Sequence, residues 1–203
     1  MSTSKAPSRR RNARLLIAGA IVAGLAASAA VVWHASYSAF SAQTTNPSSN
    51  WTAGTVGLSD DDSNTALFSA TGLKPGSTGT KCIAVTSTGS LASAVKLYGT
   101  NSSTTNALAG SINLSITQGT GGGFGSCTGF TALATGAGVY SGTLDAFGKS
   151  ATSYATGLGT WAPTGSGSET RVYQITYTLD AAAPNTVQGG TASIGLTWEA
   201  QNS

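Results

Sequence analysis

The sequence predicts an all-β protein, a single antiparallel β-sandwich of jelly-roll type that follows an N-terminal signal-peptide helix. Three observations predict this fold class. Only 8% of the 203 residues are charged, against roughly 25% in an average soluble protein, which excludes a helical surface coated with Lys and Glu. Gly, Ser and Thr together make up 85 residues. Finally, no stretch after the signal peptide shows sustained helical periodicity, whereas short alternating runs are frequent.

The first element is a signal peptide over residues 1–38. Five of the ten basic residues precede residue 15, and residues 15–33 carry no charge. A basic segment, an apolar segment and small residues are the parts of a secretory signal. We place the cleavage between Ser38 and Ala39, because Ser36 and Ser38 supply small residues at the two selective positions. The apolar run exceeds the usual length, so an uncleaved membrane anchor is the alternative, and either form exports the rest of the chain.

The exported part begins with a polar leader at residues 39–50, which we expect to be flexible, and continues as one domain over residues 51–203. Alternation of apolar and polar residues predicts strands along this domain. In chain order, they span residues 51–58, 66–70, 81–87, 91–98, 112–116, 171–179 and 191–199. Between the predicted strands at residues 112–116 and 171–179, residues 119–160 are rich in Gly, and we expect a long excursion without clear elements.

Two tryptophans are assigned by their surroundings. Trp198 is in phase with Ile194 and Leu196, so we expect it in the core. Trp161 stands among Gly, Ser and Pro163, and we expect it to be the most exposed aromatic residue. A sugar-binding platform would need more than one such ring.

The charges and the single histidine exclude several functions. Residues 39–203 hold five basic and seven acidic side chains, which are scattered, so we expect no nucleic-acid partner. His34 lies in the signal peptide. The exported chain therefore has no imidazole base for a Ser–His–Asp or Cys–His nucleophile, and no His ligands for a catalytic zinc. The remaining acids are read as surface residues rather than a glycosidase pair: Asp145, Glu169, Asp180 and Glu199.

Cys82 and Cys127 are the only cysteines. An even pair in an exported protein predicts one disulfide. Closing a loop of this length contributes roughly 4 kcal/mol in the chain-entropy account. A redox pair or a metal site is the alternative, disfavoured by the long separation and the absence of nearby His.

The acidic run at residues 60–64 is the one candidate metal site. Asp60, Asp62 and Asn64 alternate as in loops that direct oxygen atoms at Ca²⁺. The Gly and Glu that an EF-hand loop requires are replaced by Thr65 and Thr71. A solvated acidic turn is the alternative, and no other cofactor is expected.

Several motifs, in order, resemble one family. The signal ends in Ala-Ser-Tyr-Ser-Ala-Phe-Ser at residues 35–41, and Trp-Thr-Ala-Gly-Thr-Val follows at residues 51–56. Gly-Leu-Lys-Pro-Gly at residues 72–76 precedes Ile-Ala-Val-Thr-Ser-Thr-Gly-Ser-Leu at residues 83–91, and the carboxyl end over residues 185–201 also matches. This pattern resembles the TasA/camelysin family of Gram-positive bacteria, whose signal peptides are cut by a SipW-type signal peptidase.

The resemblance implies a secreted jelly-roll protein of the cell surface or biofilm matrix. Subunits of this kind polymerise when the N-terminal segment adds a strand to the next subunit, and here residues 39–50 would be the donor. The chain departs from the family at Ser87, where Asn is usual, and in having a cysteine pair. Camelysin is catalogued as a metalloprotease, but no His-Glu-x-x-His motif exists here.

We therefore expect a non-enzymatic, secreted structural protein that polymerises through its leader and that is anchored in the membrane if the signal is not cleaved. Its partners would be other copies of itself or cell-envelope components, with signal peptidase acting during export. The alternative function is an exported, monomeric β-sandwich module that binds a glycan or calcium.

Overall fold

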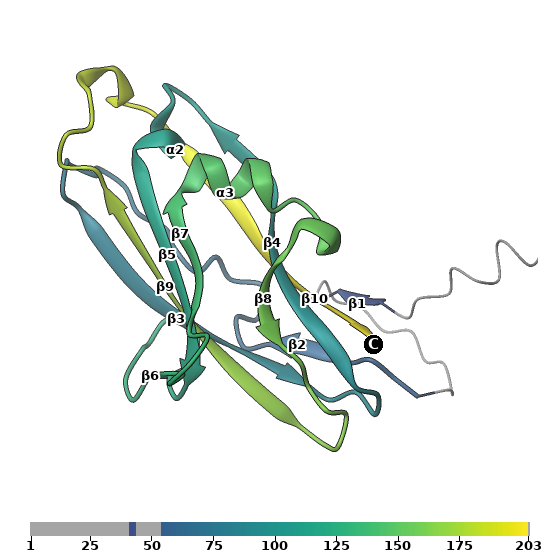
Figure 1. The fold of residues 1–203 in the computed structure, drawn as a ribbon. Helices are drawn as coiled ribbons and strands as arrows, with labels where there is room; N and C mark the ends of the chain where they lie inside the picture. Colours follow the sequence, from purple (N-terminus) through teal and green to yellow (C-terminus); the bar gives the residue numbers. More distant parts are fainter. Residues whose placement is uncertain (1–40, 44–53, 203) are drawn as a thin grey trace, which may run out of the picture. The chain divides into compact units, whose positions relative to one another are not determined.

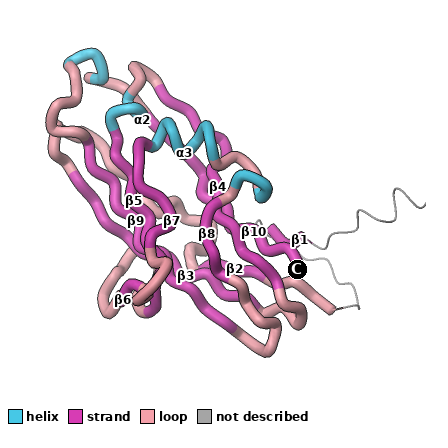
Figure 2. The backbone as a smooth tube through the Cα atoms, in the orientation of Figure 1, coloured by secondary structure: helices cyan, strands magenta, loops and turns pink. Residues whose placement is uncertain are grey.

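A computed structural model of the chain describes residues 41–43, as backbone only, and residues 54–202. The described part is an all-β sandwich, as predicted, in which two antiparallel sheets pack against each other (Figure 1). Loops and short helices connect the strands at the ends of the sheets (Figure 2). No helix in residues 41–43 and 54–202 is long and apolar enough to cross a membrane.

The first sheet contains four strands in the order β1-β10-β4-β8. Their bounds are Ser41–Gln43 for β1, Ala192–Asn202 for β10, Ser93–Thr104 for β4 and Leu158–Trp161 for β8. β10 and β4 form the centre of this sheet, since their pairing runs from Ala192 opposite Thr104 to Asn202 opposite Ser93.

The second sheet has the order β2-β3-β9-β5-β6, and β7 also pairs with β5. The bounds are Leu58–Asp60 for β2, Thr78–Ser87 for β3, Glu169–Leu179 for β9, Ile112–Thr120 for β5, Thr131–Ala132 for β6 and Gly138–Thr143 for β7. β9 lies between β3 and β5 and pairs with both along nearly its whole length.

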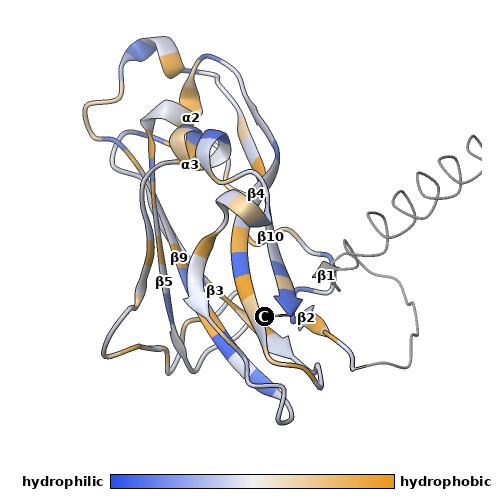
Figure 3. Cartoon of the chain, turned by 45° about the vertical axis from the view of Figure 1, so that its right-hand side comes forward, coloured by the Kyte–Doolittle hydropathy of each residue, from blue (hydrophilic) through white to orange (hydrophobic). Residues whose placement is uncertain are grey.

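The core lies between the sheets and is built from the residues whose alternation predicted the strands. Ile116, Ile175 and Trp198 are each at most 2% exposed. Tyr173 packs on Trp198 with ring centroids 5.3 Å apart, and this contact joins the two sheets. Bands of hydrophobic and hydrophilic residues alternate along several of the strands (Figure 3). The predicted core position of Trp198 is confirmed.

The outer face of the second sheet shows how a chain with so few charges faces water. Threonine hydroxyls on β3 and β9 meet in pairs across the strands, at 2.9–3.0 Å. The pairs are Thr78 with Thr178, Thr80 with Thr176 and Thr86 with Thr170. Such cross-strand contacts stabilise a sheet without charged side chains.

The Gly-rich segment at residues 119–160 is more ordered than the sequence predicted. It contains β6, β7, the start of β8, the helix α3 at Leu144–Ser150 and the 3₁₀ turn η1 at Tyr154–Thr156. Thr143 caps α3 because its hydroxyl accepts a hydrogen bond from the Ala146 N–H at 3.1 Å. Two further short helical segments are α2 (Leu108–Ser111) and η2 (Asn185–Val187), and like α3 they are too short to show sustained helical periodicity in the sequence.

Three further predictions are wrong. Residues 54–57 are not a strand, and β2 begins only at Leu58. Residues 66–70 form no strand either, although Phe68 still packs edge-on against Tyr177 at 5.1 Å. Trp161 is only 4% exposed, because β8 joins the first sheet and the Arg171 guanidinium lies 5.9 Å from the centre of its ring.

Candidate functional site

The predicted cleavage site, Ser38 and Ala39, lies outside the described residues, and so does most of the leader. The part of the leader that the structure describes is β1. Cleavage after Ser38 therefore remains a prediction.

β1 pairs antiparallel with the C-terminal strand β10. Ser41 lies opposite Gln201, Ala42 opposite Ala200, and Gln43 opposite Glu199. The leader thus contributes a strand to the first sheet, at the edge formed by β10 (Figure 1).

β1 covers only part of that edge of β10. β10 extends from Ala192 to Asn202, and β1 pairs with Glu199, Ala200 and Gln201. Within the described part of the chain, residues 192–197 have no strand partner on this side. An edge strand presents unpaired N–H and C=O groups in a row, which is a template for another strand.

The carboxylate of Glu199 lies at this edge and was misjudged as a surface acid. It is only 6% exposed. The Tyr98 hydroxyl donates to its Oε2 at 2.8 Å, and the Gln201 amide donates to its Oε1 at 2.9 Å. Burial, and secondarily the negative charge of Glu199, raise the pKa of Tyr154 above its ordinary value. The only hint of this burial in the sequence was the position of Glu199 in the middle of a strand.

The candidate calcium ligands lie at the end of β2 and in the turn that follows. Asp60 is the last residue of β2. Asp62 accepts a hydrogen bond from the Asn64 N–H through Oδ1 at 2.6 Å, and Ser63 and Asn64 both have positive φ, as in a tight turn. Among the described residues, no three His, Cys, Asp or Glu side chains lie close enough to hold a metal ion. The calcium site stays a prediction.

Asp61, between the two candidate ligands, makes the long-range contacts. Its Oδ1 accepts from the Ala84 N–H at 2.9 Å, and its Oδ2 accepts from the Phe124 N–H at 2.7 Å. One carboxylate thus joins the turn after β2, the strand β3 and the Gly-rich loop. No pattern in the sequence singled it out, because its partners are 23 and 63 residues away.

The predicted disulfide between Cys82 and Cys127 is confirmed, with the two Cα atoms 5.1 Å apart. It links β3 to the loop over residues 121–130, which also contacts β3 through its backbone. Gly125 donates to the Cys82 carbonyl at 2.9 Å. The disulfide is the kind of link expected of a protein that matures in an oxidising compartment.

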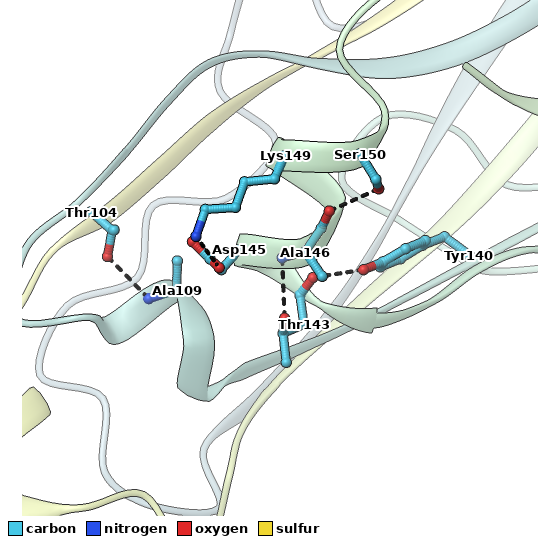
Figure 4. Close-up of polar contacts among 8 residues, drawn as sticks. All are labelled: Thr104, Ala109, Tyr140, Thr143, Asp145, Ala146, Lys149 and Ser150. Atoms are coloured by element: carbon cyan, nitrogen blue, oxygen red, sulfur yellow. Dashed lines mark hydrogen bonds and ion pairs between the residues drawn. The ribbon is translucent and has the colours of Figure 1, made fainter. Parts of the chain in front are cut away.

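A small polar pocket lies near α3, with a volume of about 180 Å³. It is lined by Ser102, Ser103, Thr104, Ala109, Leu144, Asp145, Lys149 and Ser193. At its rim, Lys149 Nζ is 2.7 Å from Asp145 Oδ2, and the Thr104 hydroxyl accepts from the Ala109 N–H at 3.1 Å (Figure 4). The pocket is smaller than the roughly 300–1,000 Å³ of typical ligand sites, so it has room for one small polar molecule.

Glu169, at the start of β9, is the remaining acid with a perturbed pKa. The Thr164 hydroxyl and the Thr164 N–H both donate to its Oε1, at 2.7 and 2.6 Å. These hydrogen bonds hold the pKa of Glu169 below its ordinary value. They fix the turn before β9.

Comparison with known proteins identifies no relative. No protein-family model matches the chain, and a search of curated proteins found no match. The resemblance to the TasA/camelysin family therefore remains a prediction from the motifs alone.

Proposed function

We propose that this protein is a non-enzymatic, secreted structural subunit of the cell surface or the extracellular matrix, and that its copies join by strand addition. The observation that carries the proposal is the pairing of β1 with β10. Residues 41–43 of the leader pair as a strand with the edge of the first sheet. A leader that fits this edge in its own chain offers the same backbone groups to another copy.

The register of β1 supports the donor role of the whole leader. β1 runs antiparallel to β10, with Gln43 opposite Glu199. Continued in the same register along β10 of another copy, the pairing would bring residue 45 opposite residue 197 and residue 50 opposite residue 192. The leader, as predicted from the sequence, therefore has the length and direction needed to fill the open part of β10. Head-to-tail addition of this kind does not close on itself and gives a filament.

The disulfide and the surface chemistry support the cellular setting. A disulfide persists in oxidising compartments outside the cytoplasm. The outer face of the second sheet carries threonine pairs instead of charges, so copies can lie beside each other without strong electrostatic repulsion.

Cross-linking between copies tests the proposal. We would prepare the chain from residue 39 as two variants, Ser41→Cys and Gln201→Cys, and mix them under mild oxidation. Directly opposed strand residues are within the Cα separation that a disulfide requires. We expect dimers of one Ser41→Cys chain with one Gln201→Cys chain, and none when Asn113→Cys, on the exposed face of β5, replaces Gln201→Cys. A chain that carries both substitutions is tested alongside. If cross-links form only within this chain and never between chains, the leader pairs with β10 of its own chain alone.

The alternative function, a monomeric module that binds a glycan, is favoured by one observation, the polar pocket near α3. Hydroxyl and charged groups beside apolar Ala109 and Leu144 suit a single sugar ring. A titration with monosaccharides, followed by amide chemical shifts, would support this function if the shifts concentrate at Ser102, Asp145 and Ser193. The absence of such shifts at millimolar sugar would remove it.

A further inference from the structure

The edge of the second sheet at β3 is partly covered by a second strand. β2 pairs with β3 only from Val85 to Ser87. The backbone groups of residues 78–84 that point away from β9 are therefore not covered by a strand in the described part of the chain. β3 is ten residues long, and such an edge invites pairing with another chain.

The open groups next to β2 are closed in another way. The Cys82 carbonyl accepts from the Gly125 N–H at 2.9 Å. The Ala84 N–H donates to Asp61 Oδ1 at 2.9 Å. The Cys82 carbonyl and the Ala84 N–H, which lie next to the pairing with β2, therefore each have a partner that is not a strand.

Two links hold the loop in this position. Asp61 binds the loop through Oδ2, which accepts from the Phe124 N–H at 2.7 Å, while Oδ1 binds β3. The Cys82–Cys127 disulfide is the second link. Within the loop, Gly123 and Ser126 exchange backbone hydrogen bonds at 3.0 Å, so it is a closed turn and cannot itself extend the sheet.

We propose that the loop over residues 121–130 is an edge cap, held by Asp61 and the disulfide, which closes β3 to pairing with β3 of a second copy of this chain. A partner strand would form a ladder of hydrogen bonds here. In its place, the cap supplies one loop N–H and one carboxylate. A charged group at a strand edge is itself a barrier to pairing, because a partner strand would bury it.

A second copy is the partner that fits, because β3 is complementary to itself. In an antiparallel pair centred on Ile83, Cys82 lies opposite Ala84 and Lys81 lies opposite Val85. No like charges meet, and residues 82–87 contain no charge at all. An uncharged segment rich in β-branched residues is the kind that associates when its edge is exposed.

The cap gives direction to the assembly proposed above. With β3 closed, a long edge that could compete with β10 is removed, and this favours joining of copies head to tail over branching at β3. This consequence rests on the proposed function, whereas closure of β3 does not, and the two are tested separately.

The test uses the chain from residue 39 with Asp61→Ala, and Asp62→Ala as the matched control. Both changes remove one carboxylate from the same turn, but the hydrogen bond that Asp62 makes with a described residue stays within that turn. We expect amide hydrogen exchange at Ala84 and Phe124 to rise about tenfold or more in Asp61→Ala and to stay unchanged in Asp62→Ala. Exchange at Ile175 in β9 should stay slow in both, which shows that the sheet is intact.

A phosphine reductant opens the second link, the Cys82–Cys127 disulfide. The disulfide takes up two electrons and two protons to give two thiols, and the phosphine becomes its oxide. We expect reduced Asp61→Ala to form an additional dimer in sedimentation velocity, and reduced wild type to form it more weakly. Reduced wild type also keeps the test valid if Asp61→Ala does not fold.

A second substitution, Ala84→Pro, identifies the surface. Its N–H points away from β9, so proline is tolerated there but cannot donate to a partner strand. The additional dimer should disappear in reduced Asp61→Ala/Ala84→Pro. Cross-linking between Ser41→Cys and Gln201→Cys, measured separately under mild oxidation without the phosphine, should persist in chains that carry Ala84→Pro. If reduced Asp61→Ala associates no more than reduced Asp62→Ala, or if Ala84→Pro leaves the dimer, the cap is overturned. Loss of the Ser41–Gln201 cross-link instead overturns the proposed function.

Discussion

Replacing both cysteines, as Cys82→Ala with Cys127→Ala, should lower the free energy of unfolding by about 4 kcal/mol. The disulfide joins residues that are 45 positions apart. Without it, the unfolded chain gains the freedom of an open loop of that length, and the chain-entropy account converts this freedom into the stated value. Cys82 is also fully buried, so its truncation to Ala leaves a small cavity that adds up to about 1 kcal/mol.

Urea unfolding followed by tryptophan fluorescence measures the effect. For a domain of this size, about 4 kcal/mol corresponds to a decrease in Tm of roughly 8–16 °C. Reduced wild type is the internal control, because it opens the same loop without changing any residue. The two proteins should agree to within about 1 kcal/mol, since only the cavity at Cys82 separates them.

A decrease below about 1 kcal/mol in the double variant would refute this reasoning. It would mean that the loop stays attached to β3 without the disulfide, through Asp61 and the Gly125–Cys82 hydrogen bond alone, or that the unfolded chain is already compact there.

Three other predictions concern single residues. Phe147→Ala should lower the free energy of unfolding by about 3–5 kcal/mol, because Phe147 is fully buried and anchors α3; urea titration measures it, and a loss below about 1 kcal/mol would contradict the placement of α3. Thr164→Val should raise the pKa of Glu169 in an NMR titration, since the Thr164 hydroxyl is the main cause of its lowering. Because folding lowers the pKa of Glu169, its stabilisation is present above the pKa of the unfolded state and is lost as the pH falls through the pKa of the folded state. Thr164→Val should therefore weaken the dependence of the free energy of unfolding on pH in the acid range. An unchanged titration of Glu169 would rule out the hydrogen bond. Glu199→Gln should lower the pKa of Tyr154 in a spectrophotometric titration but not restore its ordinary value, because burial is the larger cause. An unchanged pKa of Tyr154 would show that the charge of Glu199 does not act on it.

The strands that the sequence predicted best are those buried on one face and long enough to show it. In β9, Tyr173, Ile175 and Leu179 are buried and Tyr177, on the same face, is partly buried, and the period of two in the sequence is the direct result of the pleat. The segment at residues 66–70 shows the same alternation over only five residues. It has no partner strand in the described structure, so the pattern there reflects packing of Phe68 and not a strand.

The helix α3 could not be found by periodicity. It has seven residues, about two turns, and two turns are too few for an apolar face to repeat. Trp161 was misplaced for a different reason. Its neighbours in sequence are turn residues, but pairing with β4 and contact with Arg171 bury it, and the β4 partner, Val95, is distant in sequence.

The same limit applies to the candidate site. The disulfide was predictable because cysteine chemistry leaves one pairing for two cysteines. Asp61 was not, because its role comes from the backbone N–H groups of Ala84 and Phe124, and a backbone donor leaves no trace in the sequence. The pairing of β1 with β10 has the same character: the resemblance to a family suggested only that the leader adds a strand to another subunit, and nothing in the sequence pointed to β10.

The role of the leader is tested most directly by electron microscopy of negatively stained protein. The oxidised chain from residue 39 and the chain from residue 51 would be imaged at the same concentration. The account predicts filaments in the first and separate particles in the second, with both chains equally folded by circular dichroism. Filaments that persist without residues 39–50, or a folded full-length chain that never forms them, would contradict assembly by strand addition at β10.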